Sequence, residues 1–167
     1  NKVRCINYKI SNLILKVTKP ETVGNDRICN IFATIKLYQT PAIIVDFGTA
    51  TTYDIINEKG EFIGGVIAPG VETSAEYLFQ KGALLKKIDL EFPSHIIGLN
   101  TKENIQSGIM YGAIDQVEGM IYRINHETKI KNNIILTGGL SSVLAKHISL
   151  QHILDVDLTL KGMLYFD

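Results

Sequence analysis

The sequence is poor in residues that stabilise secreted or metal-bound domains. It has no tryptophan and only two cysteines, Cys5 and Cys29, with no further cysteine or histidine at metal-site spacing. It also lacks an excess of either charge, because 17 basic residues balance 17 acidic ones. Nucleic acids and anionic membranes need a concentrated positive field, so neither is expected as the main partner. With no membrane-length apolar run and no recognisable signal peptide, we expect a cytoplasmic protein with reduced thiols.

What is present is the composition of an ordinary folded domain. Hydrophobic residues make up 46% of the 167 positions and charged residues 20%, which is far from the composition of a disordered chain. This length suffices for one domain with a sizeable core, or for one lobe with a short piece of another. The sequence opens at Asn1 with a pattern typical of a domain interior, and we expect it to be a fragment of a longer protein.

Apolar periodicity and turn residues predict an α/β protein with a mixed sheet. A helix is expected from residue 24 because apolar positions repeat at helical spacing from Ile28 to Ile35. A hairpin is expected around Gly60 because two apolar stretches flank a short turn. The other expected elements are extended stretches within 1–19, strands at 42–47, 53–57, 61–68 and 133–136, helices at 71–81, 100–125 and 140–147, an irregular connection at 83–99, and a strand-like stretch after 150.

The strongest candidate for a functional site is the segment from Asp46 to Asp54, which reads Asp-Phe-Gly-Thr-Ala-Thr-Thr-Tyr-Asp. Glycine lets the backbone approach a ligand closely, exposed N–H groups can form an anion nest, and hydroxyls add donors. The acid that ends the preceding strand can hold or orient a cation there. The same segment also fits a plain β-turn whose threonines reflect strand propensity.

Two further segments carry weaker signals. Gly138 and Gly139 stand between an expected strand and an expected helix, where bare backbone can lie against a nucleoside or phosphate. Many ordinary strand–helix loops also contain two glycines. Asp26 and Arg27 stand in the first turn of an expected helix, where an acid is favourable against the helix dipole. As a functional pair, the aspartate would accept a proton from a hydroxyl while the arginine binds a carboxylate.

Together these segments occur in an order that resembles the actin/hexokinase/Hsp70-like kinase superfamily and, within it, the type III pantothenate kinases. The resemblance covers nearly all of 20–162 and implies an actin-like, ribonuclease H-like mixed sheet with flanking helices. In that reading, residues 1–40 are a remnant of the N-terminal lobe with the start of the connecting helix, and 41–167 form the C-terminal actin-like lobe. The segments that carry the resemblance are 20–27, 45–54, 64–70, 98–101, 108–112 and 137–140.

The resemblance also implies an activity, which is the phosphorylation of pantothenate by ATP in the first step of coenzyme A biosynthesis. Magnesium would arrive with the nucleotide, and the protein would form a homodimer in which Thr101 reaches the partner's site. By resemblance, Asp26 would accept the proton of the pantothenate hydroxyl, and Asp46 would bind a monovalent cation, K⁺ or NH₄⁺. Pantothenate would be contacted by Gly24, Asn25, Asp26, Arg27 and Thr101. ATP would be contacted by Gly48, Thr49, Gly138 and Gly139.

Two departures from the family pattern bear on this expectation. The family opens with a strand that carries an Asp-x-Gly-Asn-Thr phosphate loop, and no such segment occurs in these 167 residues. We therefore expect this chain alone to transfer phosphate poorly or not at all. In addition, Val17 stands near the position where the family usually has a pantothenate-contacting tyrosine.

Two other functions are compatible with the fold. One is a non-catalytic relative that serves as an accessory factor in transcription regulation. The enzyme is favoured over it by the joint presence of Asp26, Arg27, Asp46 and Thr49. The other is a superfamily kinase that acts on a sugar or acetate, and the Gly-x-Asp-Arg segment argues against that substrate class.

Overall fold

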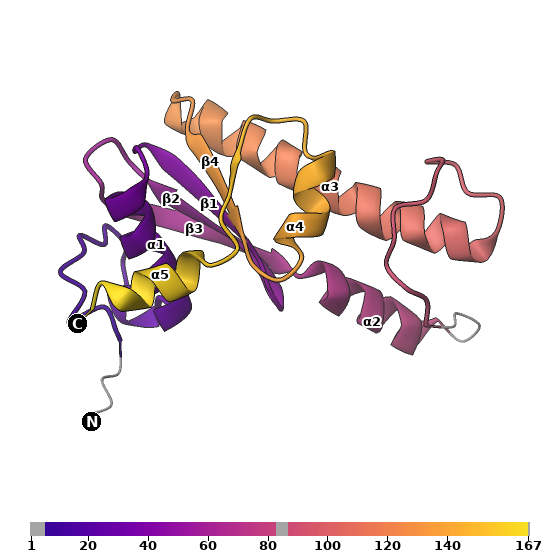
Figure 1. Cartoon of the computed structure of the whole chain (residues 1–167), viewed down its shortest axis with the longest axis horizontal. Helices are drawn as coiled ribbons and strands as arrows, with labels where there is room; N and C mark the ends of the chain where they lie inside the picture. The colour runs from indigo at the N-terminus through magenta and orange to yellow at the C-terminus, as the bar shows by residue number, and fades with distance from the viewer. Residues whose placement is uncertain (1–5, 83–86, 167) are drawn as a thin grey trace.

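The computed structural model describes residues 6–82 and 87–166. Their strands form one mixed five-stranded sheet in the order β3-β2-β1-β4-β5 (Figure 1). The pairs β1–β2 and β2–β3 are antiparallel, whereas β1–β4 and β4–β5 are parallel. The predicted mixed sheet is thus confirmed. The strands are β1 (Ala42–Phe47), β2 (Ala50–Ile56), β3 (Phe62–Pro69), β4 (Asn133–Thr137) and β5 (Ile153–Leu154).

Helices cover both faces of this sheet. α1 and α5 lie together at one side, while α2 and the first half of α3 project beyond the sheet (Figure 1). No helix in the described part of the chain is long and apolar enough to cross a membrane. The helices are α1 (Asn25–Leu37), α2 (Val71–Lys81), α3 (Thr101–Thr128), α4 (Ser141–Leu144) and α5 (Leu158–Leu164), with 3-10 turns at Pro20–Thr22 and Ala145–His147.

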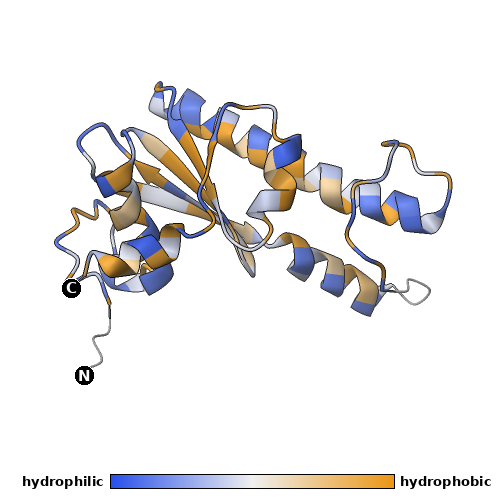
Figure 2. Cartoon of the chain, viewed as in Figure 1, coloured by the Kyte–Doolittle hydropathy of each residue, from blue (hydrophilic) through white to orange (hydrophobic). Residues whose placement is uncertain are grey.

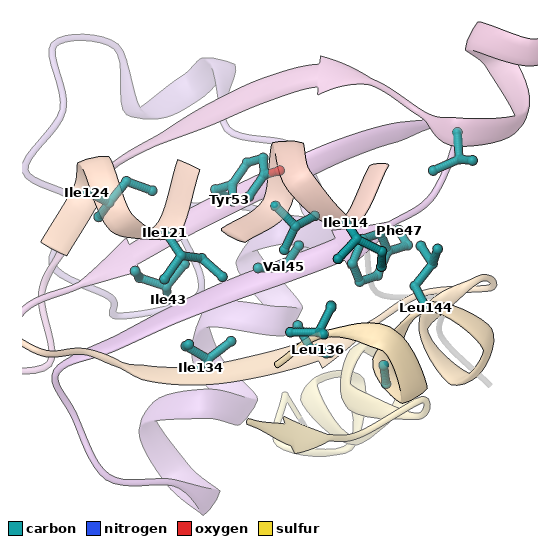
Figure 3. Packing of buried hydrophobic residues seen from close by; sticks show 14 of the residues in the cluster. Ile43, Val45, Phe47, Tyr53, Ile114, Ile121, Ile124, Ile134, Leu136 and Leu144 are labelled. Atoms are coloured by element: carbon teal, nitrogen blue, oxygen red, sulfur yellow. The ribbon is translucent and has the colours of Figure 1, made fainter. Parts of the chain in front are cut away.

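The alternation of side chains along β1 divides the core and decides where its acid points. Ile43, Val45 and Phe47 pack with α3 and α4 on one face (Figure 3). Ala42 and Ile44 pack with residues of α1 and α5 on the other. Because successive side chains of a strand point to opposite faces, Asp46 shares the α1 face with them. In Figure 2 the orange, apolar colour is correspondingly concentrated on the central strands.

The register of the strand pairs shows which residues of β2 and β3 lie on the sheet face covered by α1. Asp54 stands directly opposite Ile44 across the β1–β2 pair, and Gly65 stands opposite Asp54 across the β2–β3 pair. Residues directly opposite one another share a face. A charged residue and a glycine therefore lie beneath α1, within an otherwise apolar sheet.

The last helix packs closely on α1. A Cβ on Gly162 would collide with the backbone of Cys29, so only glycine permits this approach. Asp155, just before α5, accepts a hydrogen bond from the Tyr38 hydroxyl (2.6 Å) and pairs with Lys161 Nζ (2.7 Å). These contacts seat α5 against α1 and the carboxyl end of β4.

Several predicted elements are confirmed and others are corrected. The helix at 71–81 has the expected bounds, and α3 begins with the expected cap, since the Asn100 side chain accepts the Glu103 N–H (3.0 Å). The connection from 87 to 99 is irregular as expected, whereas residues 83–86 lie outside the described residues. β2 begins three residues earlier than predicted, so the bend after β1 consists only of Gly48 and Thr49.

The ends of the chain were predicted less well. The expected extended stretches in 1–19 amount, in the described part, to an isolated bridge between Leu15 and Phe62, and residues 1–5 lie outside the described residues. The helix expected at 140–147 is the short α4 followed by a 3-10 turn. The strand-like stretch expected after 150 is the short β5, and the helix α5 that follows it was not predicted. Its apolar–polar start and Gly162 disfavour a helix locally, and packing on α1 overrides that preference.

Candidate functional site

Two glycine turns that are far apart in the sequence meet at the carboxyl ends of β1 and β4. The parallel pairing sets Asp46 opposite Thr137, and Gly138 follows at once. A Cβ on Gly138 would collide with Asp46 Oδ1 and with the backbone of Phe47. Gly138 also has a φ of 94°, a conformation that favours glycine. The two predicted nucleotide-binding segments therefore adjoin each other, with the Asp46 carboxylate against the second.

The bend of Gly48 and Thr49 is fixed by the start of α2. The Thr49 carbonyl accepts the Gly70 N–H (3.1 Å) and the Thr73 hydroxyl (2.7 Å). Both bend residues are exposed. The contacts with Gly70 and Thr73 thus fix the backbone of this turn, while the Thr49 side chain and the solvent-facing surface of the turn remain accessible.

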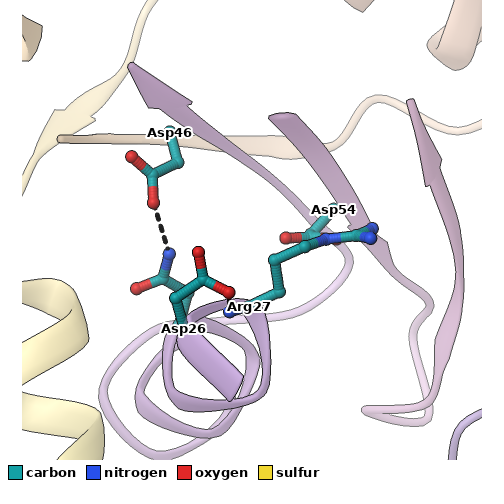
Figure 4. Close-up of polar contacts among 5 residues, drawn as sticks. Asp26, Arg27, Asp46 and Asp54 are labelled. Atoms are coloured by element: carbon teal, nitrogen blue, oxygen red, sulfur yellow. Dashed lines mark hydrogen bonds and ion pairs between the residues drawn. The ribbon is translucent and has the colours of Figure 1, made fainter. Parts of the chain in front are cut away.

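Asp26 lies exposed in the first turn of α1. Its Oδ1 accepts the Arg27 N–H (2.8 Å), and a Cβ on Gly24 would come within 2.5 Å of the same oxygen. The preceding glycine thus leaves room for the carboxylate to fold back over the helix start. Asn25, the first residue of α1, is also exposed. Figure 4 shows the Asp26 carboxylate on the side of α1 that faces Asp46 and Asp54.

Asn30, one turn after Asp26, orients the Asp46 carboxylate. Its Nδ2 donates to Asp46 Oδ2 (2.8 Å), and its Oδ1 accepts from the Thr159 hydroxyl (2.7 Å). Because a carboxylate accepts hydrogen bonds, the amide NH₂ group of Asn30 faces Asp46, and its carbonyl oxygen is left to accept from the Thr159 hydroxyl. Burial raises the pKa of Asp46, the bond from Asn30 opposes this rise, and the charge of Asp26 adds to it.

Arg27 turns away from Asp26 and pairs with Asp54. Its Nε (2.9 Å) and Nη2 (2.5 Å) both donate to Asp54 Oδ1. Asp54 is fully buried, and its Oδ2 has no hydrogen-bond partner in the described part of the chain. Burial raises the pKa of Asp54 to about 6, and the hydrogen bonds and positive charge of Arg27 oppose this rise.

A cavity of about 350 Å³ lies beside this pair. Val17, Lys19, Arg27 and Gly65 are among its lining residues. Thr101 lines a different cavity, a groove of about 780 Å³ between α2 and α3 whose lining includes no residue of α1. The structure thus gathers residues 24–27, 46–49 and 138 into one region, with Gly139 next along the chain, and does not bring Thr101 to them within one chain.

Asn30 and Thr159 of this region were missed by the sequence analysis, and Asp54 was included only as the last residue of the segment that begins at Asp46, without a role of its own. Asn30 stands four residues after Asp26, which places both on one side of a helix. Asp54 interrupts an apolar strand, and buried acids are seldom found unpaired. Those two signals were available in the sequence. Thr159 had none, because its contact depends on how α5 packs.

The donor set limits which ions the region could hold. Among residues 6–82 and 87–166 no group of three or more histidine, cysteine, aspartate or glutamate side chains is arranged to bind a metal. Asp46 Oδ1 has no hydrogen-bond donor from the described residues, so it is available to a ligand. A single carboxylate without histidine or cysteine beside it among the described residues suits a hard cation with oxygen ligands and does not suit zinc.

The sheet order, the helices on both faces and the adjoining turns after β1 and β4 define an actin-like α/β fold. A Campylobacter jejuni protein described as a conserved member of the Baf family of transcriptional activators matches it with a TM-score of 0.67, over 96% of this chain and 70% of its own, at 22% identity. The activator of 2-hydroxyisocaproyl-CoA dehydratase from Clostridium difficile, with bound ADPNP, matches with a TM-score of 0.50, over 82% of this chain and 62% of its own, at 13% identity. At such identities the likeness shows the fold alone.

The chain belongs to the type III pantothenate kinase family, whose pattern matches residues 3–123. A type III pantothenate kinase from Sulfurihydrogenibium sp. is 46% identical over 155 residues, and one from Bacillus cytotoxicus is 48% identical over 153 residues. These alignments cover 93% and 92% of this chain but only 62% and 58% of the relatives. The chain therefore spans about three fifths of the length of the relatives it matches.

Proposed function

We propose that the protein containing this chain phosphorylates pantothenate with ATP, the first step of coenzyme A biosynthesis. The observation that carries the proposal is the common orientation of the Asp26 and Asp46 carboxylates, which lie on facing elements beside the two glycine turns (Figure 4). Phosphoryl transfer requires an acid to steer the attacking hydroxyl and a separate cradle for the phosphates. Family membership supplies the substrate class.

On the acceptor side, Asp26 would take the proton of the pantothenate hydroxyl as that oxygen attacks the γ-phosphorus. One oxygen of Asp26 is occupied by the Arg27 N–H, which leaves the other for the substrate. Gly24 and Asn25 would contact pantothenate at the helix start, and the Arg27 guanidinium would bind its carboxylate beside the 350 Å³ cavity. Positioning of this kind supplies much of the rate in phosphoryl transfer.

On the nucleotide side, the exposed backbone of Gly48 and Thr49 would bind phosphate oxygens, and Gly138 and Gly139 would lie against the nucleoside. Asp46 Oδ1, which lies close to Gly138 because that residue has no side chain, would bind a monovalent cation. That cation and the magnesium carried by ATP would neutralise charge on the phosphates. Asn30 would keep the carboxylate turned toward this position.

We further propose that the groove between α2 and α3 is where two copies of the chain meet, so that Thr101 enters the partner's acceptor site. Gly108 and Gly112 have open space at their Cβ positions, and Tyr77 and Leu78 are exposed beside them. Small residues permit close helix approach, and exposed apolar surface of this kind marks an interface.

Gly112→Glu is accordingly expected to convert the dimer to monomer in sedimentation velocity, because it places a charge within the apolar groove. Gly119→Glu is the matched control, since Gly119 lies on the same helix with open space around it but outside the groove. A monomeric wild-type chain, or equal association of the two variants, would contradict the proposal.

The 167-residue chain by itself is proposed to be a weak enzyme, because it contains no Asp-x-Gly-Asn-Thr segment. We expect turnover of pantothenate and ATP about two or more orders of magnitude below that of the Bacillus cytotoxicus relative, since part of the charge stabilisation of the phosphates is missing. Product formation can be followed by mass spectrometry, and pantothenate binding by saturation-transfer NMR. Turnover at the relative's rate would refute the impairment, whereas absence of pantothenate binding would refute the assigned function.

The transcription-accessory alternative is not favoured. The Campylobacter jejuni protein carries a description of that kind, but it is 22% identical to this chain. The relatives at 46% and 48% identity are both named type III pantothenate kinases. The grouping of Asp26, Arg27 and Asp46 in one region also suits chemistry more than simple binding.

A further inference from the structure

The Arg27 side chain is held on three sides. Asp54 binds its Nε and Nη2 from below, and the guanidinium carbon lies 5.6 Å from the centre of the Phe62 ring. A Cβ on Gly65 would come within 2.5 Å of Arg27 Nη2, so glycine at this position makes room for the guanidinium. Only 14% of the arginine side chain remains exposed. What remains borders the 350 Å³ cavity.

Without this arrangement the guanidinium could turn to a second carboxylate. Asp26 precedes it on the helix and is exposed, and Asp46 and Asp54 both sense the negative charge of Asp26. A freely rotating guanidinium pairs with whichever carboxylate costs least to desolvate, and an exposed one costs less than a buried one. An Asp26–Arg27 pair would occupy both the proposed proton acceptor and the proposed carboxylate-binding group.

We propose that Asp54 is a positioning residue, which anchors the Arg27 guanidinium over Gly65 at the edge of the cavity and thereby keeps it away from Asp26. Asp54 suits this role because β2 is hydrogen-bonded on both sides, so its carboxylate cannot follow a moving arginine. The inference rests on the proposed function, since it assigns Arg27 and Asp26 to the acceptor site. It makes Asp54 necessary for acceptor binding although it does not touch the acceptor.

Whether pantothenate affinity rises or falls when Asp54 is neutralised distinguishes a positioning role of Asp54 from a simple charge effect. Removing a negative charge next to an anion-binding arginine would by itself strengthen binding of the pantothenate carboxylate. Loss of the anchor has the opposite effect, because Arg27 turns to Asp26. We therefore expect Asp54→Asn to weaken pantothenate binding about tenfold, as a charge-assisted bond is replaced by a neutral one.

Isothermal titration of pantothenate into the 167-residue chain measures this change. Asp155→Asn is the matched control, because it removes a buried acid from another ion pair, with Lys161, and Asp155 does not line the cavity beside Arg27. The control is expected to bind as the wild type does. Binding by Asp54→Asn that equals or exceeds the wild-type affinity would overturn the inference.

A second experiment tests the anchor without any substrate. Arg27→Gly leaves a guanidinium-sized space between Asp54, Phe62 and Gly65, and added guanidinium at millimolar concentration should raise the melting temperature of this variant by about 3 °C relative to equal sodium chloride. The double variant Arg27→Gly/Asp54→Asn should show no such rise. Equal stabilisation of the two variants, or of neither, would overturn the inference.

The two experiments also distinguish failure of the inference from failure of the proposed function. If the wild-type chain does not bind pantothenate while guanidinium stabilises only the variant that retains Asp54, the anchor stands and the assigned substrate is wrong. If pantothenate binds to wild type and to Asp54→Asn alike, the substrate stands and the anchor is wrong.

Discussion

Asp26→Asn is expected to lower the rate of pantothenate phosphorylation by about two to four orders of magnitude in the protein that contains this chain. The amide retains an oxygen that can accept the Arg27 N–H, so the start of α1 is preserved. It cannot take a proton from the attacking hydroxyl. Steady-state kinetics should therefore show a fall in kcat with little change in the KM for pantothenate.

Glu21→Gln provides the control for this loss. Glu21 is an exposed acid that precedes α1, and its replacement removes the same charge without touching the proposed site. Its kcat should match that of the wild type. If Asp26→Asn kept the wild-type kcat, the proton would leave by another route and the assignment of Asp26 as base would be wrong.

Gly138→Ala is expected to destabilise the fold by about 3 kcal/mol, the sum of a left-handed alanine and an overpacked contact. The added methyl would collide with Asp46 Oδ1 and with the backbone of Phe47 at a φ of 94°. Both backbones are held close to this point, because the parallel pairing of β1 and β4 extends to Asp46 and Thr137, immediately before Phe47 and Gly138. Urea unfolding monitored by circular dichroism measures the difference in free energy.

Gly139→Ala distinguishes this packing effect from a general sensitivity of the turn to alanine substitution. Gly139 has open space at its Cβ position and no positive φ, so its alanine variant should unfold within about 0.5 kcal/mol of the wild type. Equal stability of the two alanine variants would show that the close approach of β1 and β4 is not maintained in solution. A large loss in both would assign the sensitivity to the turn as a whole.

Local patterns were sufficient to predict the strand that carries Asp46 and the helix that carries Asp26. The helical spacing of apolar residues after Gly24 indicates which face of the helix is buried, and the apolar run before Asp46 indicates a buried strand. Because side chains alternate along β1, the Asp46 side chain then points toward α1. Family resemblance named Gly138, but only the parallel register of β1 and β4 shows that it touches Asp46. The roles of these residues stay predictions.

Contacts that depend on register or helix packing could not be predicted. The Arg27–Asp54 pair requires β2 to place Asp54 opposite Ile44, and β3 to place a glycine beside it. The bond from Thr159 to Asn30 requires a short helix whose own sequence favours an extended start. In both cases tertiary packing supplies information that periodicity within a window does not contain.

The bond from Thr159 has a consequence for how the protein is made. Thr159 and Asn30 are separated by 129 positions, so their contact forms only after the whole stretch between them has been synthesised. Until then the Asn30 amide lacks one of the two side-chain hydrogen bonds that hold it in the folded protein. A nascent chain can therefore possess β1, β2 and β3 before the contacts that orient the Asp46 carboxylate are complete.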